Sequence, residues 1–154
     1  MIINHLCIRS PDIKVTRAGT TLLELCVVLA VMSALVAIAL PRLREVGDRT
    51  AARSAIQEGS SLFSLGRRAA ITRRATVGVV IDSISGSIVV RAGSAVIARR
   101  GLRAQYGVQI TASRDSMSYD PRGLGYGAAN LTVVARRGRA AETLFVSRLG
   151  RTRH

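Results

Sequence analysis

The longest apolar stretch of the chain lies near its beginning. Residues 25–40 contain no charged residue, and Leu22 and Leu23 extend the run backwards with Glu24 as its only charge. At about 1.5 Å per residue, a helix of this length nearly spans the hydrocarbon core of a bilayer, so we expect a membrane helix over residues 22–40. A carboxylate near the start of a membrane helix is costly, which marks Glu24 as a candidate functional residue.

An amphipathic pattern follows the apolar run. Apolar side chains recur at steps of three and four residues, with arginines and Glu58 between them, which predicts that the helix continues to about Ala75. Pro41 would kink or loosen this helix. Each glycine in its interior weakens it by up to about 1 kcal/mol relative to alanine, but also permits close packing. These glycines are Gly47, Gly59 and Gly66.

The hydrophobic period changes after Arg74. Short β-branched and apolar runs alternate with segments rich in Gly, Pro, Asp and Ser, which predicts antiparallel strands. The expected strands are residues 75–81, 87–91, 95–98, 108–112, 116–119, 131–135 and 143–147. Residues 120–127 are expected to form a loop, and residues 136–139 the tip of the last hairpin.

The segment Arg17-Ala18-Gly19-Thr20-Thr21-Leu22-Leu23-Glu24-Leu25 resembles the N-terminus of type IV pilins and type II secretion pseudopilins. In these families a dedicated peptidase removes a short basic leader after a Gly and methylates the new amine. The fifth residue after the cut is Glu, and a Pro lies about twenty residues into the helix. The resemblance implies a cut after Gly19, methylation of Thr20, and assembly roles for Glu24 and Pro41. Thr20 is the first residue after this cut, a position where these families usually have Phe or Met.

Two other interpretations of this segment remain open. A secretory signal peptide cut after Ala37-Ile38-Ala39 fits the small-residue rule, although Glu24 would then lie inside its apolar core. The other interpretation is a signal anchor that is never cut. Three basic residues precede the apolar run and four arginines follow it. Because basic residues favour the cytoplasmic side of a membrane, this count slightly favours a cytoplasmic C-terminal part over an outward one. The outward placement of the C-terminal part therefore rests on the pilin resemblance.

A second resemblance covers the later part of the chain. Met117-Ser118-Tyr119-Asp120-Pro121-Arg122-Gly123 is similar to a signature of the GspH/FimT group of minor pilins, and its spacing to the last two strands and to Gly150-Arg151-Thr152-Arg153 also fits. The resemblance implies an α+β, type IV pilin-like fold, in which a long N-terminal helix packs on a small antiparallel β domain. The expected parts are a leader (1–19), a transmembrane helix (20–41), an amphipathic helix (42–74) and a periplasmic β domain (75–154).

The chain is strongly basic, with a formal net charge of +14. Residues 1–19 hold three basic residues and one acidic residue, so their removal would leave +12 and a chain without lysine. Arginine has a planar fork suited to phosphate, and such a charge suggests an anionic partner: nucleic acid, a membrane surface or an acidic polysaccharide. Because Trp is absent and aromatic residues are scarce, base stacking is not expected to dominate nucleic-acid binding.

Residues suited to catalysis or metal binding are few. Cys7 and His5 lie in the expected leader, Cys26 in the apolar run, and His154 at the last position. We find no Cys/His cluster, no nucleophile–His–acid set and no phosphate-binding loop, so we expect no enzyme, no metal and no cofactor. The scattered aspartates on expected loops are interpreted as solvated turn residues: Asp82, Asp115 and Asp120.

The arginines carry the remaining functional signal. From residue 84 onward twelve arginines oppose three acidic residues, a local net charge of +9. On an extended backbone Arg151 and Arg153 would point the same way and straddle neighbouring phosphates, and Gly150 would let the backbone approach. In the FimT branch a Gly-Arg-x-Arg motif is associated with DNA binding, which the resemblance carries to these residues. The candidate DNA-binding residues are Arg136, Arg137, Arg139, Arg148, Gly150, Arg151 and Arg153.

We therefore expect a FimT-like minor pilin in the bacterial inner membrane, spanning it once and later entering a pilus. Its expected partners are prepilin peptidase, other major and minor pilins, inner membrane lipid, and double-stranded DNA bound non-specifically during natural transformation. Glu24 is expected to neutralise an N-terminal amine when subunits pack. The alternative is a GspH-like minor pseudopilin of a type II secretion system, whose arginines form only a solvated surface.

Overall fold

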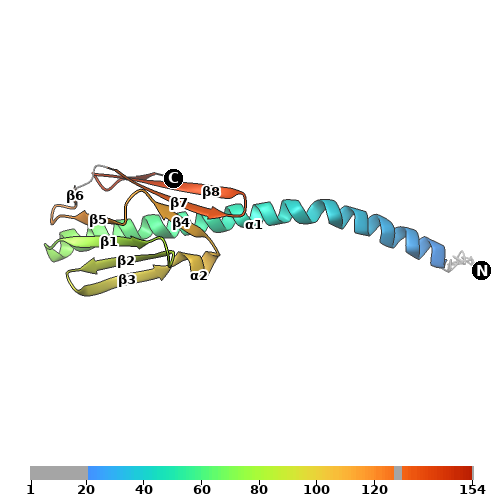
Figure 1. Cartoon of the computed structure of the whole chain (residues 1–154), viewed down its shortest axis with the longest axis horizontal. Helices are drawn as coiled ribbons and strands as arrows, with labels where there is room; N and C mark the ends of the chain where they lie inside the picture. The colour runs from blue at the N-terminus through green and yellow to red at the C-terminus, as the bar shows by residue number, and fades with distance from the viewer. Residues whose placement is uncertain (1–20, 127–129, 154) are drawn as a thin grey trace, which may run out of the picture. The chain divides into compact units, whose positions relative to one another are not determined.

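The computed structural model describes residues 21–126 and 130–153. A long helix, α1 (Leu22–Arg73), precedes all the described strands. The chain divides into two compact units, residues 1–38 and residues 39–154. Figure 1 labels most strands of the second unit. The expected leader, with the cleavage position Gly19 and Thr20, lies outside the described residues.

The described part of the first unit is an exposed apolar helix. The Oγ1 atom of Thr21 accepts a hydrogen bond from the backbone N–H of Glu24 at 3.2 Å, so Thr21 caps α1 and Glu24 lies in the first turn. Residues 21–38 are all exposed, and by length and composition this part of α1 suffices to cross a membrane. The helix assignment continues through Pro41, so this proline does not end α1.

The second unit contains two antiparallel sheets. One sheet has the strand order β3-β2-β1-β5-β6, and the other has the order β4-β7-β8-β9. A short helix, α2, connects β3 to β4. The elements are β1 (Val77–Asp82), β2 (Ser87–Ala92), β3 (Ala95–Gly101), α2 (Leu102–Tyr106), β4 (Gln109–Ala112), β5 (Ser116–Tyr119), β6 (Gly125–Tyr126), β7 (Asn130–Arg137), β8 (Ala140–Ser147) and β9 (Thr152–Arg153).

All seven expected strands are present, and the fold class is confirmed. The differences concern three short elements: α2, which the sequence did not predict, and the two-residue strands β6 and β9. Helix α2 has only five residues and depends on its surroundings: Leu102 is buried, and the Arg103 N–H donates to the carbonyl of Gly86 at 3.1 Å. Elements this short contain too few residues to show a hydrophobic period.

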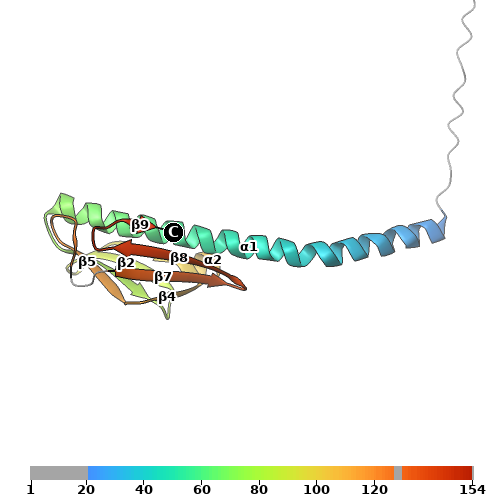
Figure 2. The same ribbon diagram turned by 90° about the horizontal axis from the view of Figure 1, so that it is seen from above.

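The core lies between α1 and both sheets (Figure 2). One face of α1 is buried at steps of three and four residues: Ala52, Ala55, Ile56, Gly59, Leu62, Phe63, Gly66 and Ala70. A Cβ added at Gly59 would lie 3.6 Å from Ile88 on β2 and 3.8 Å from Leu144 on β8, so this residue lies where the two sheets meet. Within residues 21–126 and 130–153, all buried hydrophobic residues fall between Ala52 and Val146. A fragment of residues 39–154 therefore keeps the whole described core.

Two ion pairs connect α1 to the β domain within the described ranges. Arg100 Nε lies 3.2 Å from Glu58 Oε1, and Arg137 Nε lies 3.1 Å from Asp48 Oδ1. The Tyr106 hydroxyl donates to Glu58 Oε2 at 2.7 Å, and this bond raises the pKa of Tyr106 above its usual value. In both pairs the arginine is exposed and the carboxylate half-buried. Pairs at a protein surface contribute about 1 kcal/mol or less each, so these two orient the helix more than they stabilise it.

We predict that Gly66→Ala destabilises the second unit although alanine favours helix. A Cβ at Gly66 would lie 2.7 Å from Val79 Cγ2, and overpacking of this kind costs about 1–3 kcal/mol. Gly47→Ala is the matched control, because no atom lies within 4 Å of a Cβ there and the change should stabilise by up to about 1 kcal/mol. Urea unfolding of residues 39–154 measures both. Equal stability of the two variants would show that Gly66 is not a close contact.

We also predict an alkaline loss of stability that depends on Tyr119. This residue is fully buried, its hydroxyl has no hydrogen-bond partner among the described residues, and burial raises its pKa to about 12 against the opposing effect of Arg67. Because the folded state holds the phenolic proton more tightly than the unfolded state, the unfolding free energy falls between about pH 10 and 12, by roughly 2–3 kcal/mol in full.

Tyr119→Phe should remove most of this loss, leaving the part that comes from Tyr106, whose pKa is also raised. Stability at about pH 7 should be unchanged or higher, since no unpaired hydroxyl remains buried. The control is Tyr126→Phe, whose ring is 76% exposed and should not alter the pH profile. The measurement is the urea midpoint of residues 39–154 across this alkaline range. An unchanged slope in Tyr119→Phe would rule out Tyr119 as the titrating group.

Candidate nucleic-acid interface

The residues after β8 fold back onto it in a turn that we call the arginine turn (residues 148–153). The Gly150 N–H donates to the carbonyl of Ser147 at 2.8 Å, and the Ser147 N–H donates to the carbonyl of Arg151 at 2.9 Å. Gly150 has a φ of 72°, in the left-handed region that favours glycine. The chain then pairs with β8 as β9, with Arg153 opposite Phe145.

The extended backbone of β9 separates its side chains onto two sides. Thr152 is half-buried, and its Oγ1 atom lies 2.9 Å from the hydroxyl of Ser60 on α1, which donates to it. Arg151 and Arg153, on either side of Thr152, are exposed. Since successive side chains of a strand alternate, contact of Thr152 with the helix directs both arginines away from it.

Gly150 has a structural role that the sequence did not predict. A Cβ at Gly150 would lie 2.8 Å from Cδ of Arg67, and a Cβ at Gly123 would lie 3.2 Å from Nε of the same arginine. Arg67 therefore passes from α1 between two glycine turns. We expected Gly150 to let the backbone approach a phosphate, but its left-handed φ and its contact with Arg67 already account for glycine at this position.

The loop of the GspH/FimT-like signature lies beside the arginine turn. Asp120 Oδ1 accepts hydrogen bonds from the backbone N–H groups of Arg122 and Leu124, at 2.9 and 2.8 Å, as an aspartate does when it closes a turn. At the end of this loop the Gly125 N–H donates to the carbonyl of Arg148 at 2.7 Å. This hydrogen bond connects the residues just after the first C-terminal motif (117–123) to those just before the second (150–153).

An open groove of about 560 Å³ lies on the outer side of the β7-β8-β9 sheet, and we call it the outer groove. Phe145 and Leu149, each 56% exposed, lie in it beside Arg151 and Arg153. None of its lining residues is acidic, which suits a phosphate group electrostatically. They are Asn130, Thr132, Phe145, Val146, Ser147, Leu149, Arg151 and Arg153.

The structure separates the seven candidate residues into two groups at opposite ends of β8. Arg148, Gly150, Arg151 and Arg153 belong to the arginine turn, whereas Arg136 and Arg137 are the last residues of β7 and Arg139 lies in the turn to β8. The hairpin tip is thus shorter than the expected 136–139, because Arg136 and Arg137 pair with β8. Arg136 pairs with Ala141, which is on the same face of β8 as Phe145 and hence as Arg153. Ala141 and Phe145 are four steps apart along β8, a distance of about 13 Å. The two groups therefore share one face through Arg136, without forming a single cluster.

Arg137 does not belong to that face. Besides its ion pair with Asp48, it donates a hydrogen bond to the backbone carbonyl of Tyr106 at 2.7 Å. Its charge is thus already opposed by a carboxylate, and it connects the hairpin to α1 and α2. Sequence reasoning grouped it with its neighbours because the position of Asp48, 89 residues earlier in the chain, cannot be read from the local pattern.

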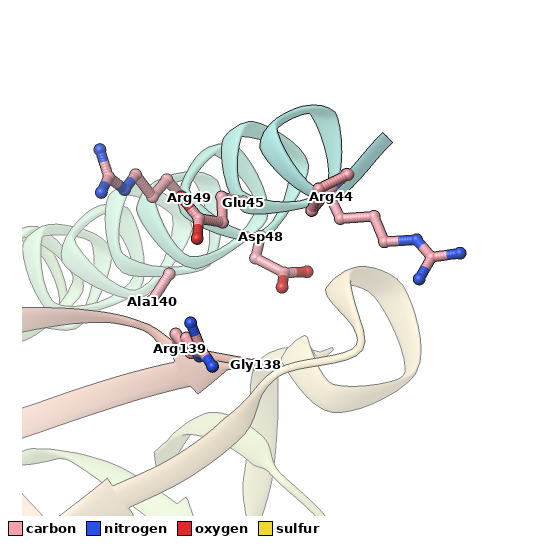
Figure 3. Close-up of a pocket in the computed structure, with 8 residues that line it drawn as sticks. Arg44, Glu45, Asp48, Arg49, Gly138, Arg139 and Ala140 are labelled. Atoms are coloured by element: carbon pink, nitrogen blue, oxygen red, sulfur yellow. The ribbon is translucent and has the colours of Figure 1, made fainter. Parts of the chain in front are cut away.

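The hairpin tip faces α1 across a second cleft, of about 550 Å³ (Figure 3). Gly138, with a φ of 54°, lies opposite Asp48, and a Cβ there would collide with the Asp48 carboxylate. Three arginines line this cleft (Arg44, Arg49 and Arg139), but Glu45 and Asp48 line it as well, whereas no acidic residue lines the outer groove. The cleft is therefore less suited to an anion than the outer groove.

Other chemistry receives little support from the described part of the chain. Within it, no group of three or more His, Cys, Asp or Glu side chains could hold a metal ion. Asp82 closes the β1–β2 turn, and its bond from the Ser85 hydroxyl lowers its pKa below the usual value. The residue that sequence reasoning missed is Phe145. Its position between the inward-facing Leu144 and Val146 was the available signal.

Two crystal structures of the type IV minor pilin FimU from Pseudomonas aeruginosa are similar to this chain. One is 16% identical, with a TM-score of 0.58, and the match covers 68% of this chain and 88% of FimU. The other is 13% identical, with a TM-score of 0.55, and the match covers 66% and 90%. No family model and no curated protein matches the sequence. At these identities the likeness shows the fold, which is type IV pilin-like, as the sequence predicted.

Proposed function

We propose that the chain is a FimT-like minor pilin that assembles into type IV pili and binds double-stranded DNA non-specifically for uptake in natural transformation. The observation that carries the DNA-binding part is the arginine turn. Contact of Thr152 with Ser60 holds β9 against the domain and leaves Arg151 and Arg153 exposed on one side. Because the strand is already ordered, phosphate binding costs no further ordering of the backbone beneath these arginines, and only their side chains lose freedom. Such contacts are sequence-independent and salt-sensitive.

The charge of the surrounding surface supports this assignment. The lining of the outer groove has two arginines and no acidic residue, and Arg136 extends the same face about 13 Å along β8. Phosphates of one DNA strand follow each other every 3.4 Å or so along the helix axis, so this face is long enough to contact several of them. Arg148 adds a further exposed cation at the start of the turn.

The alternative is a GspH-like minor pseudopilin of a type II secretion system, with a structural role and no nucleic acid. A specific observation favours it: Gly150 is explained by its φ and by its contact with Arg67, so this part of the motif needs no ligand. The fold is common to both candidates. The two are therefore distinguished by the function of the arginines rather than by their arrangement.

The N-terminal part of the proposal concerns assembly. Prepilin peptidase cuts after Gly19 and methylates Thr20, α1 holds the protein in inner membrane lipid with the β domain in the periplasm, and the mature chain joins other major and minor pilins. Glu24 pairs with an N-terminal amine in the filament, and Pro41 adjusts α1 during packing. The exposed apolar part of α1 supports a membrane anchor and a filament contact.

We predict that residues 39–154 bind double-stranded DNA of unrelated sequences, and that binding weakens steeply as salt is raised from about 50 to 200 mM. This fragment keeps Asp48, the partner of Arg137. Arg151→Ala/Arg153→Ala should abolish most of the binding and lower the salt slope by about 0.9 for each phosphate that the variant no longer neutralises. Mobility shifts at several salt concentrations measure both effects.

The matched control for this experiment is Arg91→Ala/Arg99→Ala, which removes the same charge from exposed positions on the other sheet. An equal loss in this control would indicate diffuse attraction and would remove the special role of the arginine turn. Failure of the folded fragment to bind DNA at low salt would favour the secretion pseudopilin. Genomic neighbours of pilus or secretion type provide an independent check.

We predict that Glu24→Ala abolishes incorporation into pili while the protein still accumulates in the membrane. Glu24→Gln separates two explanations, because glutamine suits the third position of a Thr-capped helix as glutamate does but has no charge. If Glu24 acts by pairing with an amine, Glu24→Gln should fail as Glu24→Ala does. Immunoblots of sheared pili and of membranes measure the distribution. Normal assembly of Glu24→Ala would refute the role, and assembly of Glu24→Gln alone would assign Glu24 to capping.

A further inference from the structure

The outer groove contains an aromatic ring that the fold does not require. The chain has two phenylalanines, of which Phe63 is fully buried in the core, whereas Phe145 is 56% exposed on β8. Exposed apolar residues that occur singly need no explanation. Phe145 is instead accompanied by Leu149, also 56% exposed, and the two line one concave surface together with Arg151 and Arg153.

Strand register places this ring among hydrogen-bonding and cationic groups. Phe145 pairs with Thr132 on β7 and with Arg153 on β9, so the three residues form one row across the sheet. Directly opposed side chains in such a row have Cβ atoms about 5 Å apart. The adjacent row pairs Asn130 with Ser147, whose Oγ accepts a hydrogen bond from the backbone N–H of Arg151 at 3.1 Å.

We propose that the outer groove binds single-stranded DNA, with an unpaired base stacked on Phe145 and the flanking phosphates on Arg151 and Arg153. This inference rests on the proposed function, and it adds the form of nucleic acid that the same surface prefers. Arginine–phosphate contacts are available equally from one strand or two. A ring on a sheet surface reaches the face of a base only when that base is unpaired, because the faces of paired bases are covered by their neighbours.

The rest of the groove fits this occupant. Asn130 has an amide that can donate to and accept from the edge of a base, and Thr132 and Ser147 have hydroxyl groups. No carboxylate lines the groove, so a polyanion meets no repulsion there. A single aromatic residue can stack with only one base. In this mode phosphate contacts supply most of the affinity, and stacking supplies the preference for single-stranded DNA.

The absence of tryptophan from the sequence allows a direct test. Phe145→Trp in the full chain, held in a non-ionic detergent micelle, introduces a single indole at the stacking position. Oligo(dT) of about 20 nucleotides should quench its fluorescence saturably, whereas a duplex of the same length should bind without comparable quenching. The matched control is Ile84→Trp, at an 87% exposed position in the β1–β2 turn, whose fluorescence neither DNA should quench.

Fluorescence anisotropy with labelled DNA gives the affinities. Phe145→Leu keeps an apolar side chain but removes the ring, and it should weaken oligo(dT) binding about tenfold while changing duplex binding by less than about twofold. Leu149→Ala should change both affinities little. Arg151→Ala/Arg153→Ala should weaken both DNA forms together, because both depend on phosphate contacts.

The outcomes distinguish this inference from the proposed function. Arginine-dependent binding of both DNA forms without quenching at position 145, or with equal quenching by duplex, would overturn the single-strand inference and leave DNA binding in place. Absence of binding to either form would overturn both proposals. If Phe145→Leu blocks entry into pili but leaves both DNA affinities unchanged, the groove contacts another pilin and the inference is wrong.

Discussion

Close approach between α1 and the two sheets is the constraint on which the second unit depends. Small residues make this approach possible: at Gly59 the helix lies within contact distance of both sheets, and at Gly66 it leaves no room for a methyl group beside Val79. A small β domain has little interior of its own. By burying one face of α1 against both sheets it gains a continuous core, and the helix sets the relative position of the sheets.

The same packing determines where charge accumulates. Both ion pairs of the described residues use a carboxylate on α1, Glu58 or Asp48, and both draw in an arginine from the strands. The acidic groups on the helix thus neutralise arginines near it, while those on the outer faces of the sheets keep their charge. The basic surface of the β7-β8-β9 sheet follows from this separation together with the arginines concentrated at the end of β7 and in the arginine turn.

Hydrophobic period predicted the fold well and the site only in part. The continuation of α1 follows from apolar residues that recur every three to four positions, and all seven longer strands follow from short apolar and β-branched runs between turns. The apolar run near the start of the chain is equally a local feature. Helix α2 and strand β9 do not, because they are stabilised by distant contacts: Arg103 with Gly86, and Thr152 with Ser60. For the same reason the sequence grouped Arg137 with Arg136 and Arg139, and did not distinguish the exposed Phe145 from its buried neighbours Leu144 and Val146.

The contact between Thr152 and Ser60 changes how the Gly-Arg-x-Arg motif should be understood. The unspecified position of the motif is the residue that faces the helix, so its side chain must be small enough to fit there and polar enough to meet a serine hydroxyl. The motif is then a short strand with one anchored residue between two free cations, rather than a flexible charged tail. A search for related chains would gain selectivity by requiring a small polar residue at this position together with a compatible partner on the helix, about ninety residues earlier.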